Sequence, residues 1–148
     1  MKNIKMWAFF LAIACYVQGA TVSNPIIWAD VPDPSMLRVD DTYYMVSTTM
    51  HYAPGVPIMA STDLANWRTI NYAYSTLTNS NAMNLNANAS AYGKGSWASS
   101  LRYNKGTYYI LTPSYTTNKT HLYQTTDIEK GPWKETLFNF YHDPSLFF

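Results

Sequence analysis

The chain has 148 residues, with 10 basic and 9 acidic side chains, 13 tyrosines and 5 tryptophans. A net charge of +1 argues against the strongly basic face that binding to nucleic acid or to an anionic membrane requires. The only cysteine is Cys15, which excludes an intrachain disulfide and a cysteine metal site. The length is sufficient for one hydrophobic core of modest size.

The first segment has the features of an export signal. Two lysines precede an apolar run of 12 residues, Met6–Val17, and small or apolar residues follow up to Gly19. This pattern predicts a signal peptide over residues 1–19 and a secreted or periplasmic protein. The run is shorter than the roughly 20 residues of a membrane-spanning helix, although a short membrane anchor remains an alternative. A second alternative is a surface lipoprotein, in which Cys15 carries the lipid.

An internal repeat organises the rest of the chain. Its first copy runs from Asp33 through two short apolar runs, and the second runs from Trp97 through two similar runs. The leucines Leu37 and Leu101 define a step of 64 residues, and two later aspartates, Asp63 and Asp127, share this step. A third copy begins with residues 143–148.

Each copy is expected to form short antiparallel strands. Residues 35–39 and 43–48 are β-branched, apolar or aromatic and flank a polar turn, as in a β-hairpin. Further strands are expected at residues 57–61 and from Trp67 or Trp133 onward, after turns capped by Asp63 and Asp127. No segment has a sustained helical period, so no long helix is expected.

Four short strands per copy are typical of a β-propeller blade. The alternative is a β-sandwich with accidental similarity between its halves. The first copy also contains an insertion of about twenty residues, roughly Ser75 to Tyr92, which is rich in Asn, Ala and Ser. Its polarity predicts a surface loop.

Six short motifs, in this order and spacing, resemble those of glycoside hydrolase family 43, the five-bladed propeller enzymes that act on arabinosides and xylosides. The motifs are Asn24–Ile27, Val31–Ser35, Asp41–Met45, Pro54–Ile58, Ser96–Ser99 and His142–Phe148. The resemblance implies an all-β fold, a partial five-bladed β-propeller with two blades and the start of a third. Residues 20–148 would then be the N-terminal part of a catalytic domain.

The resemblance also implies an activity and a partner. The activity is inverting hydrolysis that releases arabinofuranosyl or xylosyl residues, and the partner is a plant polysaccharide or oligosaccharide. A propeller that binds carbohydrate without cleaving it remains an alternative. The feature that separates the two is a glutamate in a later blade.

In such enzymes the first Asp-Pro-Ser aspartate is the general base, which corresponds to Asp33. A second aspartate orients the general acid and raises its pKa, and it corresponds to Asp143. The acid is a glutamate further along the chain. Glu129 and Glu135, the only glutamates, lie in no matching motif. The acid is therefore expected beyond Phe148, and the chain alone is expected to be inactive.

Propeller geometry predicts where these residues meet. The innermost strands of all blades run side by side, so Asp33 and Asp143, which begin two of them, are expected at one mouth. Trp97 is expected at the equivalent place in the second blade, where its indole would contact a sugar; a core tryptophan is the alternative. His51 is a candidate substrate contact, with an exposed loop histidine as the alternative. Some family members hold a metal ion such as calcium in the channel, but no ligand cluster is present here, so no metal and no cofactor are assigned.

Overall fold

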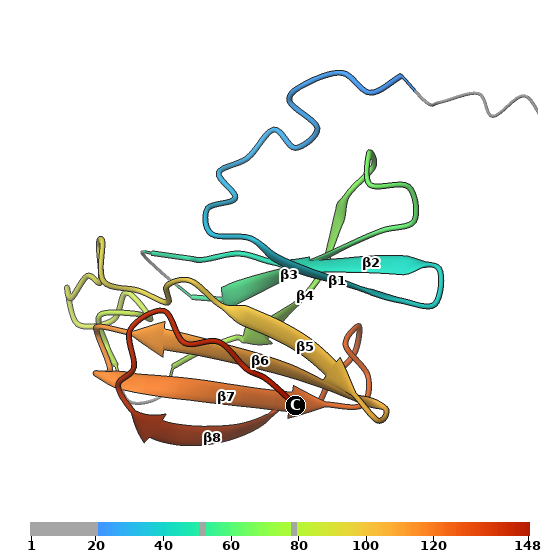
Figure 1. Ribbon diagram of the computed structural model, residues 1–148. Coiled ribbons are helices and arrows are strands. Elements are labelled where there is room, and N and C mark those ends of the chain that lie inside the picture. The colour runs from blue at the N-terminus through green and yellow to red at the C-terminus, as the bar shows by residue number, and fades with distance from the viewer. Residues whose placement is uncertain (1–20, 51–52, 78–79) are drawn as a thin grey trace, which may run out of the picture.

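The computed structural model describes residues 21–50, 53–77 and 80–148. The expected signal peptide with Cys15, and the candidate substrate contact His51, lie outside these residues. The described chain forms two four-stranded antiparallel sheets stacked on each other (Figure 1). In this part of the protein, no helix is long and apolar enough to cross a membrane.

Both sheets are simple meanders, with the strands in the order of the chain. The first sheet contains β1 (Ser35–Val39), β2 (Thr42–Val46), β3 (Gly55–Ser61) and β4 (Arg68–Tyr74). The second contains β5 (Ser100–Asn104), β6 (Thr107–Ser114), β7 (Lys119–Thr125) and β8 (Lys134–Asn139). This arrangement confirms the expected all-β class, with two four-stranded units in the places where the repeat predicts them.

The strand register corrects the alignment of the two copies by one residue. Ser35 pairs with Val46 in the first hairpin, and Ser100 pairs with Leu111 in the second. Ser100 is therefore the counterpart of Ser35, and Leu101 is the counterpart of Met36 rather than of Leu37. The matching leucines were misleading because backbone pairing, not side-chain identity, determines the register. Leu101 is fully buried, whereas Met36 is 51% exposed.

The turns that connect the third and fourth strands are closed by aspartates, as expected. Asp63 Oδ1 accepts hydrogen bonds from the backbone N–H groups of Ala65 and Asn66, at 2.9 and 2.8 Å. Asp127 Oδ1 accepts two in the same way, from Glu129 and Lys130. These side chains satisfy backbone donors where the chain reverses.

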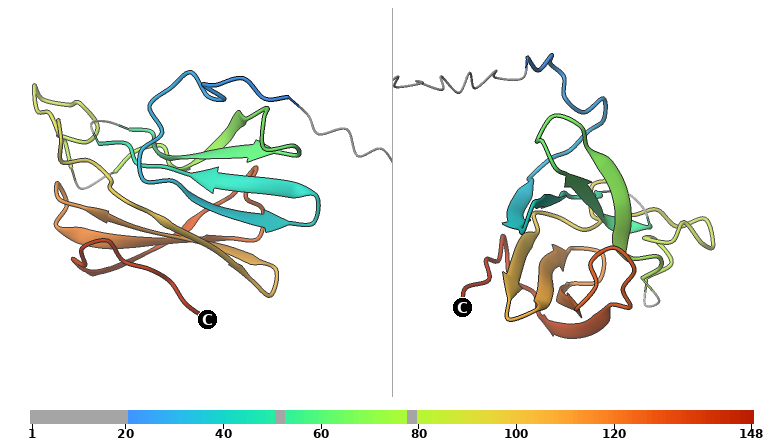
Figure 2. Two further views of the ribbon diagram at one scale, coloured as in Figure 1. Left: turned by 45° about the horizontal axis from the view of Figure 1, so that its top comes forward. Right: turned by 90° about the vertical axis from the view of Figure 1, so that its right-hand side faces the viewer.

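The core lies between the two sheets. Val46, Ile58, Leu101 and Ile110 are fully buried there. Tyrosine rings join the sheets: Tyr44 meets Tyr108 edge to face at 5.6 Å between centroids. Figure 2 shows the two sheets packed against each other along their length.

The insertion after β4 is only in part a surface loop. Met83 is fully buried within it, and Leu77 and Ala91 are almost fully buried. The Met83 carbonyl accepts a hydrogen bond from Ala53 N–H at 2.9 Å. The expected surface loop is therefore confirmed only in part, because a few apolar residues, well separated along a polar segment, are enough to fix it to the core.

The last residues run beside β5 as the start of a third inner segment. Leu146 N–H donates to Ser100 Oγ at 3.1 Å, and Arg102 Nε donates to the Leu146 carbonyl at 2.9 Å. In the same way, Leu101 N–H donates to Ser35 Oγ at 3.1 Å. The three inner segments therefore lie side by side in chain order, linked by equivalent serines.

Candidate active site

The two predicted catalytic aspartates occupy equivalent positions with the same unusual backbone. Asp33 precedes β1 and has φ of 49°, and Asp143 precedes the third inner segment and has φ of 43°. Each is followed by proline and then by a serine. Aspartate adopts a left-handed φ more readily than most residues do, so the shared backbone shows that the two segments are equivalent.

The serine hydrogen bonds show how these aspartates are ordered around the fold. Ser35 and Ser100 each accept from the following inner segment, so the three segments begin at the same end of the molecule. The corrected register makes Ala98 the counterpart of Asp33 in the second copy. Asp33 and Asp143 thus begin the first and third of three adjacent segments, and both are exposed. Their catalytic roles stay a prediction.

Trp97 was expected to be the counterpart of Asp33, but it lies one residue before that counterpart, Ala98. Its N–H donates to the Pro113 carbonyl at 3.0 Å, and its carbonyl accepts from Thr112 Oγ1 at 3.1 Å. These bonds fix the backbone at the beginning of β5. The indole ring packs edge to face against Tyr115 at 5.2 Å.

The Trp97 side chain is half-buried and borders an open cavity. The cavity measures about 370 Å³ and is also lined by Gly93, Lys94 and Tyr115. The indole Nε1 is buried and has no hydrogen-bond partner among the described residues. The ring is therefore not enclosed in the core, and its contact with a sugar stays a prediction.

Two residues that the sequence did not single out join Trp97 to Asp143. Tyr115 Oη and His142 Nδ1 share a hydrogen bond of 2.9 Å, and His142 Nε2 lies 3.4 Å from Asp143 Oδ2. The Tyr115 ring also packs against Phe140 at 4.8 Å. His142 belongs to the motif His142–Phe148, and its place beside Asp143 in the sequence is a signal that could have identified it. Tyr115 carries no such signal, because only the fold brings it to this end.

Ser96 ties the two sheets together beside this cluster. Its carbonyl accepts from Thr48 Oγ1 at 2.7 Å, and its hydroxyl lies 2.9 Å from Thr49 Oγ1. Tyr74 Oη donates to the same hydroxyl at 3.2 Å. The segments that precede β5 and follow β2 are therefore held in one hydrogen-bond network.

Both glutamates lie away from the beginnings of the inner segments. Glu129 is in the turn before β8 and forms an exposed ion pair with Arg68 at 3.6 Å. Glu135 is in β8, the strand of the second sheet furthest from β5. In the part of the chain that the structure describes, no group of three or more His, Cys, Asp or Glu side chains could hold a metal ion.

Comparisons with known proteins agree with this architecture. Residues 22–148 match the family described as glycosyl hydrolases family 43. A non-reducing end α-L-arabinofuranosidase of Bacteroides ovatus, BoGH43B, is 38% identical over 132 residues, which are 86% of this chain and 24% of that protein.

Solved structures give the same result. A bifunctional GH43-CE protein of Bacteroides eggerthii is 60% identical with a TM-score of 0.80, over 86% of this chain and 18% of that one. A xylan β-1,4-xylosidase of Bacillus halodurans is 34% identical with a TM-score of 0.71, over 86% and 25%. The chain therefore spans about a quarter or less of the length of these relatives. From its motifs, its two matched sheets and these comparisons, the chain belongs to glycosyl hydrolase family 43.

Proposed function

We propose that this chain is the N-terminal part of an exported enzyme that removes terminal arabinofuranosyl or xylosyl residues from plant polysaccharides with inversion. Relatives named as an arabinofuranosidase and as a xylan xylosidase support both sugars. The observation that carries the proposal is the pair of Asp-Pro-Ser segments. They have matching left-handed backbones and begin inner segments at the same end of the fold.

The chemistry requires two carboxyl groups with different protonation states. Inverting glycosidases place them about 6.5–9.5 Å apart, so that a water molecule fits between one carboxylate and the sugar. Asp33, ionised, would take a proton from this water as its oxygen attacks the anomeric carbon. The acid, beyond Phe148, would donate a proton to the departing oxygen.

Asp143 is assigned the role of raising the pKa of the general acid, rather than that of activating the water molecule. A negative charge beside a carboxylic acid raises the pKa of that acid, because two adjacent carboxylates resist ionising together. A raised pKa keeps the acid protonated near neutral pH, where it must donate. The contact between His142 and Asp143 would orient the Asp143 carboxylate for this task.

The test uses the longer protein that carries this chain, with aryl β-xylosides and aryl α-arabinofuranosides as substrates. Asp33→Asn keeps the shape of the side chain but removes the base, so we expect kcat to fall by about 10²- to 10⁴-fold. NMR of the first product formed should show an anomeric configuration opposite to that of the substrate. Asp41→Asn, an exposed aspartate in the first hairpin turn, is the matched control and should leave kcat unchanged.

A product that retains its configuration, or an Asp33→Asn variant with full activity, would contradict the proposal. A protein that binds xylan or arabinan but cleaves neither substrate would favour the carbohydrate-binding alternative. Whether a later blade carries the glutamate expected as the general acid then separates hydrolysis from binding alone.

A further inference from the structure

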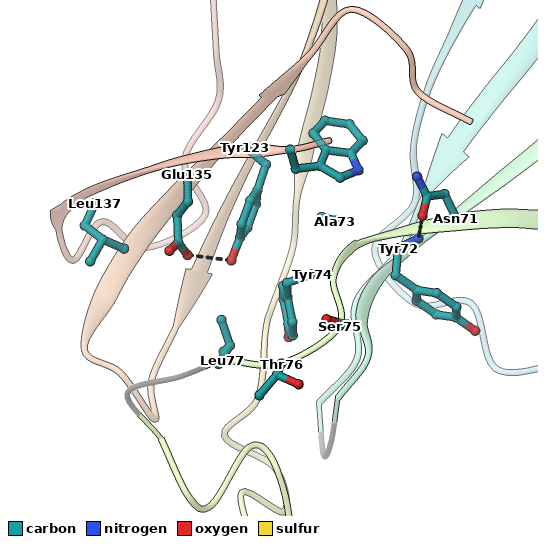
Figure 3. Close-up of a pocket in the computed structure, with 11 residues that line it drawn as sticks. Asn71, Tyr72, Ala73, Tyr74, Ser75, Thr76, Leu77, Tyr123, Glu135 and Leu137 are labelled. Atoms are coloured by element: carbon teal, nitrogen blue, oxygen red, sulfur yellow. Dashed lines mark hydrogen bonds between the residues drawn. The ribbon is translucent and has the colours of Figure 1, made fainter. Parts of the chain in front are cut away.

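A cavity separate from the Asp-Pro-Ser segments lies between the outer strands of the two sheets (Figure 3). It measures about 570 Å³, which is within the usual size of a small-ligand site. The end of β4 and the start of the insertion form one wall, with Tyr74, Ser75 and Thr76. The other wall comes from β7, β8 and the turn between them, with Tyr123, Trp133 and Glu135.

A carboxylate is held in place at this cavity by buried donors. Glu135 Oε1 accepts a hydrogen bond from Tyr123 Oη at 2.8 Å, which Figure 3 shows as a dashed line. His121 Nδ1 lies 2.8 Å from the same oxygen, and its Nε2 lies 2.7 Å from Thr117 Oγ1. His121 and Tyr123 are almost fully buried, so the carboxylate is positioned before any ligand arrives.

The second oxygen of Glu135 remains open to a ligand. Both bonds above go to Oε1, and Oε2 takes part in no hydrogen bond with the described residues. The Glu135 side chain is 41% exposed. A preorganised carboxylate oxygen at a partly open surface is a strong acceptor for hydroxyl donors.

The rest of the cavity suits a neutral polar ring. The hydroxyls of Ser75 and Thr76 are on exposed residues at its edge, and the rings of Tyr74 and Trp133 contribute apolar surface. The Trp133 Nε1 donor is buried without a hydrogen-bond partner in the described chain. Burial raises the pKa of Tyr123, so this phenol is neutral and Glu135 is the only charge among the lining residues.

The cavity is linked to the end of the molecule where the candidate active site lies. The Tyr74 ring lines it, and the Tyr74 hydroxyl donates to Ser96 Oγ at 3.2 Å, next to Trp97. One side chain therefore reaches from this cavity to the segment that precedes β5.

We propose that the cavity between β4 and β8 is a second, non-catalytic binding site for a neutral sugar unit of the polysaccharide, distant from the bond that is cleaved. Glu135 accepts hydrogen bonds from sugar hydroxyls, and the aromatic rings contact the C–H face of the sugar. The choice of a sugar as ligand rests on the proposed function. A uronic acid unit is disfavoured at this site, because its carboxylate would face Glu135.

The experiment compares a long and a short substrate with the longer protein that carries this chain. Ser75→Trp fills the edge of the cavity from an exposed position, and Glu135→Gln removes the charge. Each variant should raise KM for xylohexaose or for linear arabinohexaose, whichever the protein cleaves, by about tenfold. Kinetics on the aryl glycosides, which occupy only the catalytic pocket, should not change.

Thr126→Trp is the matched control, since Thr126 is exposed in the turn between β7 and β8 and does not line the cavity. Calorimetry with the hexasaccharides in an Asp33→Asn background measures binding without turnover, and Ser75→Trp should weaken it by about tenfold there too. Unchanged hexasaccharide affinity in both cavity variants would overturn the inference. A parent protein that cleaves no aryl glycoside contradicts the proposed function instead, and the calorimetric comparison then still tests the cavity.

Discussion

At the scale of single residues, the side chains around Asp143 are more informative than the aspartate alone. Tyr115 contacts Trp97 with its ring and His142 with its hydroxyl, and His142 lies beside Asp143. Tyr115 therefore acts as a positioning residue for the side chains next to the proposed site. Tyr115 should influence Asp143 through its hydrogen bond to His142.

Tyr115→Phe removes this hydrogen bond but keeps the ring contacts. We expect kcat of the longer protein on aryl glycosides to fall by about fivefold, the equivalent of one hydrogen bond of about 1 kcal/mol. The pH dependence of kcat should also shift, because the orientation of Asp143 influences the pKa of the acid. Tyr141→Phe, a nearby exposed tyrosine whose hydroxyl makes no hydrogen bond with the described chain, should change neither quantity.

Asp63 caps the turn between β3 and β4, and its ionisation should affect stability. Hydrogen bonds from the Asn66 backbone, the Asn66 side chain and Ala65 hold the pKa of this carboxyl well below its usual value. A lowered pKa means that the folded state favours the ionised form. The stabilisation is therefore complete above the unfolded pKa of about 4 and is lost as pH falls below it.

Asp63→Ala should lower the melting temperature at pH 7, and the difference from the parent should shrink as the pH falls below about 4. Differential scanning calorimetry at several pH values measures this. Asp41→Ala, which removes only an exposed ion pair with Arg38, should have little effect at any pH. A difference in melting temperature that does not depend on pH would contradict the assignment.

At the scale of elements, the innermost segments are joined by serine side chains rather than by a continuous backbone ladder. Ser35 Oγ accepts from Leu101 N–H, and Ser100 Oγ accepts from Leu146 N–H. Leu101 is fully buried, so its N–H cannot obtain an equivalent bond from water without local rearrangement. The repeat thus places one serine where each blade meets the next.

Ser35→Ala should destabilise the fold by about 1–3 kcal/mol, because it leaves the buried Leu101 N–H without an acceptor. Urea unfolding of the longer protein, followed by tryptophan fluorescence, measures the change. Ser75→Ala replaces an exposed serine that makes no hydrogen bond with the described residues, and it should leave the midpoint unchanged. Equal midpoints for Ser35→Ala and the parent would show that the bond between the segments contributes nothing.

At the scale of the whole molecule, the two sheets leave apolar surface uncovered. Large apolar side chains are exposed on the N-terminal segment, on β1, on β8 and on the last residues, among them Trp28, Met36, Phe138 and Phe147. Several blades are needed to close a propeller and to cover such faces. The surface exposed on these two sheets is of the kind that leads to association.

The isolated 148-residue chain should therefore bind the dye ANS strongly, self-associate in analytical ultracentrifugation and hydrolyse no aryl glycoside. The longer protein should remain dispersed and bind little dye. Turnover by the isolated chain that is abolished by Asp33→Ala would contradict the expectation that the general acid lies beyond Phe148.

Much of this fold could be predicted from the sequence, because the repeated features depend on the properties of neighbouring side chains. Alternating apolar residues, polar turns and the aspartates Asp63 and Asp127 act over a few neighbours, so they predicted eight strands in two similar units. The Asp-Pro-Ser segments were also visible, since they are contiguous. These features depend on short-range preferences that each segment has by itself.

The tertiary structure decided what depends on residues far apart in the chain. The strand pairing moves the alignment of the two copies by one residue, so Ala98 and not Trp97 is the counterpart of Asp33. Met83 is buried although it belongs to a mostly polar insertion, and the fold places Tyr115 next to His142. Backbone pairing and packing choose among registers and contacts that the local sequence leaves nearly equal in energy, and only the folded chain reveals that choice.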